Sequence, residues 1–173
     1  MRSPRTPIYK FGSHIPVLMK VLTLTKGSVL EMGMGFNSTL LLHWMCGVDK
    51  RKLVSYENDP SCVDWLKAKH MENDYHKVII VDDWDNADIE TSWDVAFIDH
   101  VPAIRRKDDV RRLANYAKYI VLHDTEGRVE SHHHYREIFP LFKWQYNLDK
   151  FIPNTSVLSN FIDLTGFNVN YEN

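Results

Sequence analysis

The sequence predicts a doubly wound α/β fold, in which helices cover both faces of a mostly parallel sheet. Short apolar runs alternate with helical patterns, which is typical of repeated strand–helix–strand units. The runs at 77–81 (KVIIV) and 94–98 (DVAFI) are apolar on successive positions, as in strands that are buried on both faces. Two strand-like segments near the C-terminus, 142–151 and 156–164, flank the turn-like IPNT. They predict an antiparallel hairpin at the edge of the sheet.

The strands and helices are expected to alternate along the chain. The five parallel strands are expected at residues 27–33, 52–58, 77–81, 93–99 and 118–124. The helices are expected at residues 13–25, 37–48, 59–71, 107–117 and near 128–138. Asn37 or Ser38 is a suitable N-cap for the second helix. We interpret Ser13 and His14 as capping the first helix, with closure over a bound ligand as the alternative.

The composition is that of an ordinary soluble domain. The chain has 173 residues, 44% hydrophobic and 25% charged, which predicts one domain over residues 1–173. The net charge of −2 gives no general attraction to nucleic acid. We interpret the basic run at 103–112 (AIRRKDDVRR) as the solvated face of a helix.

No apolar run approaches the roughly 20 residues of a membrane helix. Cys46 and Cys62 are expected to be free thiols, which suits a cytoplasmic location.

Every predicted parallel strand ends in acidic residues. Ligands of open α/β sheets bind at the carboxyl ends of the strands, so the residues there are candidates for one shared site. In strand order they are Glu31, Gly33 and Gly35; Glu57 and Asn58; Asp82, Asp83 and Trp84; Asp99 and His100; and His123, Asp124 and Thr125. No purely structural role requires five acidic ends in succession.

The stretch SVLEMGMGFNSTLLL, residues 28–42, carries the clearest ligand signal. Gly33 and Gly35 allow a sharp turn and a close approach of the backbone to a ligand. The following helix then directs free N–H groups toward that ligand. The carboxylate of Glu31 would repel a pyrophosphate and attract a cationic amine. Ser38 also stands where the dinucleotide fingerprint requires its third glycine.

The residues at the ends of the second and third strands indicate which chemical groups the ligand contains. Glu57 is placed to accept hydrogen bonds from a ribose diol. Asp83 can accept a bond from the exocyclic amine of adenine, and Trp84 can pack on its ring. A ligand that has an amine, a ribose and an adenine but no phosphate is S-adenosylmethionine (SAM).

These motifs resemble, in the same order, the cofactor motifs of the class I SAM-dependent methyltransferases. The matching segments are E-x-G-x-G at 31–35, the acid at 57, the pair at 83–84, WDVAFIDH at 93–100 and YIVLHDT at 119–125. The last two are most similar to the catechol O-methyltransferase group. The resemblance spans residues 10–165. It implies a Rossmann-like, seven-stranded sheet of order 3-2-1-4-5-7-6 and methyl transfer to an oxygen or nitrogen of a small molecule.

The resemblance also implies roles for single residues. The implied cofactor-binding residues are Glu31, Gly33, Gly35, Ser38, Glu57, Asn58, Asp83, Trp84, Asp99 and His100. The implied catalytic residues are Asp99, His100, His123 and Asp124. In the metal-dependent branch, Asp99 and Asp124 would ligate Mg²⁺. Thr125 stands where that branch has asparagine, and no lysine matches its catalytic base.

Three functions are compatible with this pattern. The first is a methyltransferase for a small-molecule acceptor, with or without a metal ion. The second is a nucleoside-binding module of the same fold that transfers no methyl group. The third is a metal-dependent hydrolase that uses Asp99 and Asp124. A histidine at these strand ends could bind a metal or act as a general base. The chain has no inserted cap domain, so a homodimer is one way to close the site.

Overall fold

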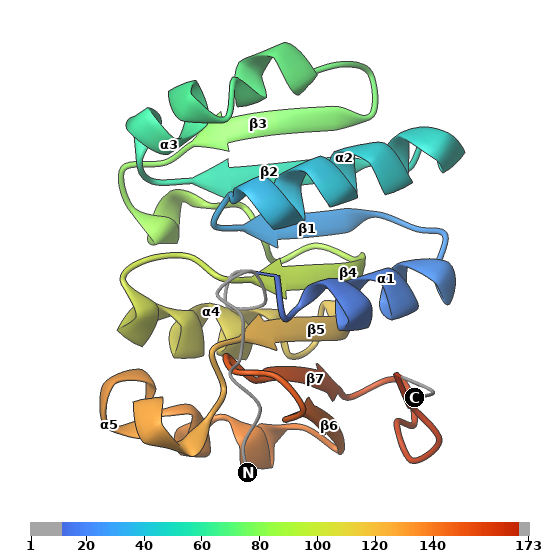
Figure 1. The fold of residues 1–173 in the computed structure, drawn as a ribbon, viewed down its shortest axis with the longest axis vertical. Helices are drawn as coiled ribbons and strands as arrows, with labels where there is room; N and C mark the ends of the chain where they lie inside the picture. Colours follow the sequence, from blue (N-terminus) through green and yellow to red (C-terminus); the bar gives the residue numbers. More distant parts are fainter. Residues whose placement is uncertain (1–11, 170–173) are drawn as a thin grey trace, which may run out of the picture.

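A computed structural model describes residues 12–169, and a seven-stranded sheet runs through its middle (Figure 1). The strand order is β3-β2-β1-β4-β5-β7-β6, which confirms the predicted doubly wound α/β architecture. The strands are β1 (Val29–Met32), β2 (Leu53–Glu57), β3 (His76–Ile80), β4 (Trp93–Ile98), β5 (Ala117–His123), β6 (Trp144–Leu148) and β7 (Thr155–Ser159).

The pairing of the strands determines where along the sheet a ligand can bind. Strand β1 is parallel to both β2 and β4, and β4 is parallel to β5. Strand β7 runs antiparallel to β5 and β6, which confirms the C-terminal hairpin. The chain winds outward from β1 to β3 and then returns to β4 on the other side of β1. The strand order therefore reverses between β1 and β4, where open α/β sheets bind their ligands.

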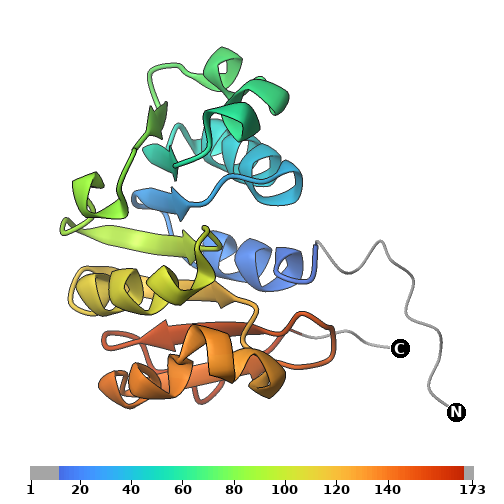
Figure 2. The ribbon, with the colours of Figure 1, turned by 90° about the vertical axis from the view of Figure 1, so that its left-hand side faces the viewer.

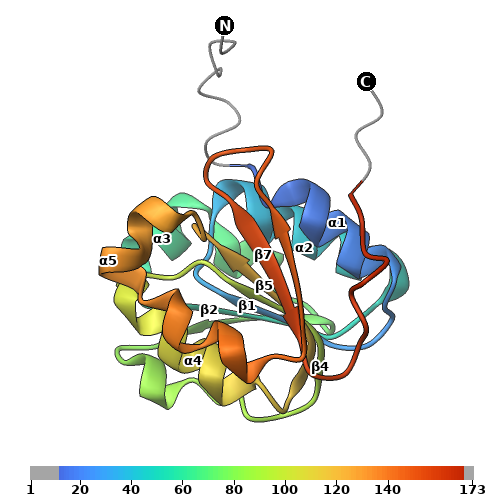
Figure 3. The same cartoon turned by 90° about the horizontal axis from the view of Figure 1, so that it is seen from below.

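Helices cover both faces of this sheet (Figures 2 and 3). The helices are α1 (Ile15–Thr23), α2 (Phe36–Asp49), α3 (Pro60–Trp65), α4 (Arg106–Leu113) and α5 (Glu130–His133). On one face, α1 and α2 bury Val17 and Leu42 in a cluster with Phe97 of β4. On the other face, Leu113 of α4 shares a cluster with Ile98 of β4. Helices thus bury both faces of β4, as its apolar run predicted. The same prediction for residues 77–81 is wrong, because β3 is the edge strand of the sheet and Ile79 and Ile80 are exposed.

Several helix boundaries differ from the expectation. The N-cap of α2 is Gly35 in an extended conformation, so neither Asn37 nor Ser38 caps this helix. Lys67 and His134 adopt left-handed conformations with φ of 52° and 55°. These residues end α3 and α5 early, and short 3₁₀ turns replace the remainder of each expected helix. None of the helices described between residues 12 and 169 is long and apolar enough to cross a membrane.

Candidate active site

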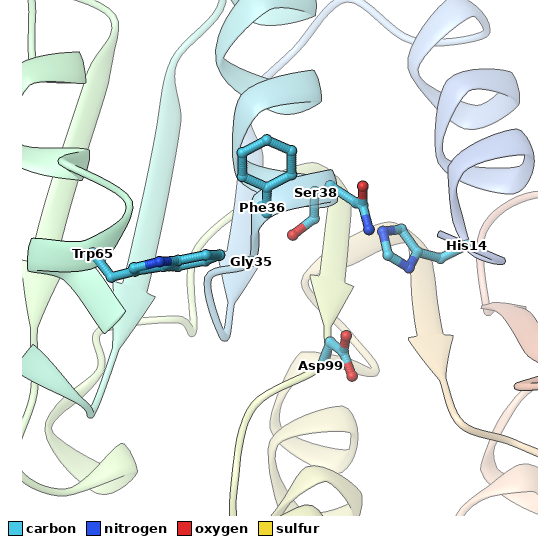
Figure 4. Close-up of a pocket in the computed structure, with 7 residues that line it drawn as sticks. His14, Gly35, Phe36, Ser38, Trp65 and Asp99 are labelled. Atoms are coloured by element: carbon cyan, nitrogen blue, oxygen red, sulfur yellow. The ribbon is translucent and has the colours of Figure 1, made fainter. Parts of the chain in front are cut away.

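A pocket of about 590 Å³ opens at the strand ends where the order reverses (Figure 4). This volume lies in the usual range for small-molecule sites. Asp99, directly after β4, contributes a carboxylate, while Trp65 and His14 lie on opposite sides of the pocket. The start of α2 supplies the remaining wall residues: Gly35, Phe36, Asn37 and Ser38. The pocket thus joins segments that follow β1, β2 and β4, as the strand-end pattern predicted.

The turn after β1 passes directly against the chain that leaves β4. Gly33 has a φ of +88°, and a Cβ on this residue would lie 2.5 Å from the backbone N and Cα of His100. An L side chain is strained in this conformation and would find no room. Gly33 therefore lets the ends of β1 and β4 come together beneath the pocket.

Glu31 lies beneath the pocket and is not part of its wall. The residue is fully buried. Its Oε1 accepts a hydrogen bond from the Thr39 hydroxyl at 2.9 Å, and its Oε2 accepts one from Ser55 at 2.6 Å. Thr39 Oγ1 in turn accepts a bond from the N–H of Gly35 at 3.0 Å. Glu31 thus fixes the turn that carries Gly35, which corrects the prediction of a direct contact with a cofactor amine.

The environment of Glu31 predicts a pH-dependent stability. Burial raises the pKa of Glu31 from 4.5 to about 7, although the hydroxyls of Ser55, Ser38 and Thr39 oppose this shift. A carboxyl group with a raised pKa in the folded state stabilises the fold at low pH, and this contribution is lost as the pH rises through about 7. Glu31→Gln resembles the protonated acid and does not titrate.

We therefore expect the stability of Glu31→Gln relative to wild type to increase with pH. The gain in free energy of unfolding between about pH 4.5 and 8 should be on the order of 3 kcal/mol. Urea denaturation of both proteins across this range measures it. If the stabilities of the two proteins changed with pH in the same way, Glu31 would not have a raised pKa in the folded protein.

Glu57 and Asn58 lie at the end of β2, beside the turn after β1, and neither belongs to the pocket wall. Oε2 of Glu57 accepts a bond from the N–H of Met34 at 2.8 Å, and Oε1 accepts bonds from Asn58 and Asp59 at 2.8 and 2.9 Å. These donors fix the carboxylate, while each oxygen retains acceptor capacity. The buried Oδ1 of Asn58 has no hydrogen-bond partner among residues 12–169. Such acceptors are uncommon, and a ribose hydroxyl would supply the missing donor.

Asp99 connects the pocket to two buried histidines. Its Oδ1 lies 3.2 Å from Nδ1 of His123, and Nε2 of His123 lies 2.9 Å from the Ser13 hydroxyl. The ring of His14 packs edge-on against His123. Burial would lower the pKa of His123, but Asp99 and Asp124 outweigh burial and raise it. Burial, reinforced by His123, lowers the pKa of His14 to about 3. His14 is thus neutral, whereas the Asp99–His123 pair attracts a proton.

The side chain of Arg106 lies between Asp99 and Asp124. Its Nη2 is 3.0 Å from Asp99 Oδ1, and its Nη1 is 3.0 Å from Asp124 Oδ2. Its other N–H groups donate to the backbone oxygens of His100 and Asp99 at 2.6 and 3.0 Å, and weakly to that of His123 at 3.4 Å. The guanidinium already occupies the position between the two carboxylates that were predicted to share Mg²⁺, and it offsets one of their two negative charges. A Mg²⁺ ion that bridged both carboxylates would have to displace this buried side chain. The residues therefore do not fit a magnesium site between Asp99 and Asp124.

His100 and Trp84 are core residues, which corrects their predicted roles. The Trp84 ring stacks on His100 with 4.1 Å between ring centroids, and its Nε1–H donates to the carbonyl of Val101 at 2.8 Å. Nε2 of His100 lies 3.0 Å from the fully buried carboxylate of Asp109. Neither side chain reaches the pocket wall. Asp83 is exposed and accepts a bond from the N–H of Asp85, which caps the short turn that contains Trp84.

Four wall residues were not among the predicted site residues: His14, Phe36, Asn37 and Trp65. Phe36 and Trp65 face each other with ring centroids 6.1 Å apart, and both side chains are exposed. A signal for Trp65 was present in the sequence, because Val63 and Leu66 form the buried face of that segment and Trp65 lies off it. His14 occupies the N-cap position of α1 but makes no side-chain capping bond. Its place in the pocket wall agrees with the alternative interpretation, closure over a ligand.

The sheet order and the glycine turn beneath a pocket at the switch point are those of the class I SAM-dependent methyltransferase fold. No protein-family model matches the sequence, and no curated protein matches it either.

Solved structures do match. The O-methyltransferase TomG from Streptomyces achromogenes, in complex with SAM, has a TM-score of 0.60 at 12% identity, over 91% of this chain and 82% of that chain. Cofactor-bound Rv0187 from MTB has a TM-score of 0.63 at 13% identity, over 94% and 84%. The methyltransferase PaMTH1 from Podospora anserina, bound to S-adenosylhomocysteine (SAH), has a TM-score of 0.61 at 14% identity, over 84% and 76%. At these identities the likeness is one of fold.

Proposed function

We propose that the protein is a SAM-dependent methyltransferase that acts on an oxygen of a small-molecule acceptor. The observation that carries this proposal is the carboxylate of Asp99 in the wall of the pocket, at the switch point of a methyltransferase fold. A carboxylate at this place suits the positive charge of a sulfonium and disfavours a phosphate. The solved structures of similar fold hold SAM or SAH, which supports the same ligand here.

The residues around the pocket suit the parts of this cofactor. The backbone N–H groups in the first turn of α2, that of Ser38 included, can donate to its amino-acid carboxylate. Glu57 and Asn58 are assigned to the ribose hydroxyls, because both retain unused acceptor capacity. Trp65 and Phe36 form the apolar part of the wall, and we assign them to the adenine in place of Trp84.

The transfer itself requires positioning and a place for one proton. When bound, SAM supplies an electrophilic methyl group, and the acceptor oxygen forms its bond to carbon as the carbon–sulfur bond breaks. The Asp99–His123 pair is placed to take the proton that the acceptor loses. Ser13 fixes the other ring nitrogen of His123, and Arg106 fixes the Asp99 carboxylate. Asp124 then acts through Arg106 rather than on the substrate.

Calorimetry with SAH tests the cofactor assignment. We expect the wild-type protein to bind SAH with a Kd below about 1 mM, and Glu57→Gln to weaken binding roughly tenfold through a poorer hydrogen bond to the ribose. Glu137→Gln, at an exposed position outside the pocket, serves as the matched control. The cofactor assignment fails if the wild type shows no heat of binding, or if both variants bind equally well.

A radiolabelled transfer assay separates the enzyme from a binding module. Incubation with methyl-labelled SAM and a metabolite extract should label an extractable small molecule. Binding of SAH without any transfer would favour the nucleoside-binding module. Hydrolysis without SAH binding would favour the hydrolase that the sequence left open.

The outer face of α2 supports a homodimer as part of this proposal. Four large apolar side chains follow each other at intervals of four residues, and Trp65 extends this surface to the pocket mouth. These exposed residues are Phe36, Leu40, Trp44, Val48 and Trp65. The helix has no charged side chain before Asp49. The exposed area amounts to roughly 700 Å², close to the half-interface of about 800 Å² in stable complexes.

A second copy bound to this face would cover the pocket mouth. We therefore expect light scattering to show a dimer for the wild type and a monomer for Trp44→Glu.

A further inference from the structure

The three side chains His14, Asp99 and His123 bring metal-ligating atoms together at one place beside the pocket, where His14 and Asp99 form part of its wall. One ligand atom from each lies within 4.8 Å of the other two. The residues come from the start of α1, the end of β4 and the end of β5, so the fold assembles them from distant parts of the chain. Two imidazoles and one carboxylate are a donor set that suits borderline divalent cations such as Zn²⁺ and Co²⁺, whereas Mg²⁺ prefers oxygen ligands.

His14 provides the strongest sign that a ligand is missing. The residue is only 2% exposed, and neither of its ring nitrogens has a hydrogen-bond partner within the described part of the chain. Buried polar side chains nearly always have a partner. The ring also forms part of the pocket wall, so whatever satisfies a nitrogen can enter from the pocket.

The surroundings of His123 and Asp99 already resemble an outer coordination shell. The Ser13 hydroxyl holds Nε2 of His123 at 2.9 Å, which leaves Nδ1 directed toward Asp99 Oδ1 at 3.2 Å. Ligating histidines commonly bond through their second nitrogen in this way. Arg106 similarly holds the Asp99 carboxylate at 3.0 Å. With His123 neutral, Asp99 and Asp124 carry two negative charges against the single positive charge of Arg106, so one net negative charge remains to attract a cation in place of a proton.

We propose that His14, Asp99 and His123 form a binding site for one borderline divalent cation, with its open coordination positions toward the pocket. Ligand atoms around a tetrahedral ion lie about 3.4 Å apart, given metal–ligand bonds of about 2.1 Å. The His123–Asp99 separation of 3.2 Å is close to this value, whereas the ligand atom of His14 lies within 4.8 Å of the other two, so the His14 ring would have to move inward to bind the ion. A hydroxyl bound at an open position would become more acidic and would release its proton to solvent in the pocket, so that the Asp99–His123 pair would not need to accept it while it holds the ion.

Metal binding can be measured without SAM, so its outcome does not depend on the proposed methyl transfer. Tag-free protein is stripped with EDTA and titrated with Co²⁺ and with Zn²⁺. Stoichiometry is read by elemental analysis after dialysis, and coordination by the visible absorption of Co²⁺. We expect one ion per chain, with no displacement by millimolar Mg²⁺. His14→Ala should weaken binding at least tenfold, and Ser13→Ala should weaken it about 10- to 100-fold.

His132→Ala is the matched control. His132 is exposed in the HHH run at 132–134, which could itself attract metal ions. This variant should bind as the wild type does. The site is disproved if the wild-type protein retains no ion, if His14→Ala binds normally, or if His132→Ala alone removes the binding. Circular dichroism of each variant shows whether a loss of binding reflects unfolding, and the wild-type titration decides the question in that case.

Discussion

Replacing Asp99 by asparagine is expected to reduce kcat/KM for methyl transfer at least about 10³-fold, or about 4 kcal/mol of transition-state stabilisation. Asp99 is the only carboxylate in the pocket wall of the described residues, and its Oδ1 is the partner of both His123 and Arg106. The asparagine is nearly isosteric but removes the charge that faces the sulfonium. Steady-state kinetics with labelled SAM measure the loss.

Two comparisons keep this result interpretable. Asp108→Asn removes a carboxylate that pairs with Arg111 on the surface of α4, and it should leave kcat/KM unchanged. His123→Gln retains Asp99 and should cost roughly 10²-fold, because it removes the imidazole that takes up the proton but keeps the charge that faces the sulfonium. A wild-type rate in folded Asp99→Asn would remove this residue from the chemistry.

The second large effect is expected at Gly33, on stability. Gly33→Ala should lower the free energy of unfolding by at least about 3 kcal/mol, because strain at a positive φ adds to a backbone clash. The new Cβ would lie 2.5 Å from the backbone of His100, which a side-chain rotation cannot relieve. Urea denaturation gives the difference directly.

Gly127→Ala is the control for this substitution. No heavy atom lies within 4 Å of a Cβ built at Gly127, and its φ is not in the left-handed region. We expect a change within about 0.5 kcal/mol there. Equal stability of the two variants would mean that the turn after β1 does not depend on Gly33.

Much of the fold could be predicted from residue patterns. The apolar runs at β3 and β4 identified parallel strands, and the short IPNT segment identified the terminal hairpin. The burial of β3 was overestimated, because an apolar run does not show that a strand lies at the edge of the sheet. Gly33 was predicted as a turn residue that lets the backbone approach a ligand, whereas the structure shows that it approaches the backbone of His100. These features depend on local sequence and on general rules of α/β topology.

The candidate site was less predictable because its residues act through tertiary contacts. Arg106 lies in a basic run that resembles a solvated helix face, yet it is buried between two carboxylates. Its partners are known only once the strand ends are placed. Trp84 was assigned to the cofactor because of its place in the motif. In the structure its ring stacks on His100 and its N–H donates to the carbonyl of Val101, so the side chain points into the core. The sequence pattern gives the strand on which a residue lies, and packing decides the direction of its side chain.

The most direct test of the central claim is a crystal structure of the protein with SAH. The account predicts that the nucleoside lies in the pocket between Trp65 and His14, with its sulfur next to Asp99 and its ribose hydroxyls next to Glu57 and Asn58. A nucleoside bound elsewhere on the molecule, with this pocket still filled by solvent at saturating SAH, would contradict it.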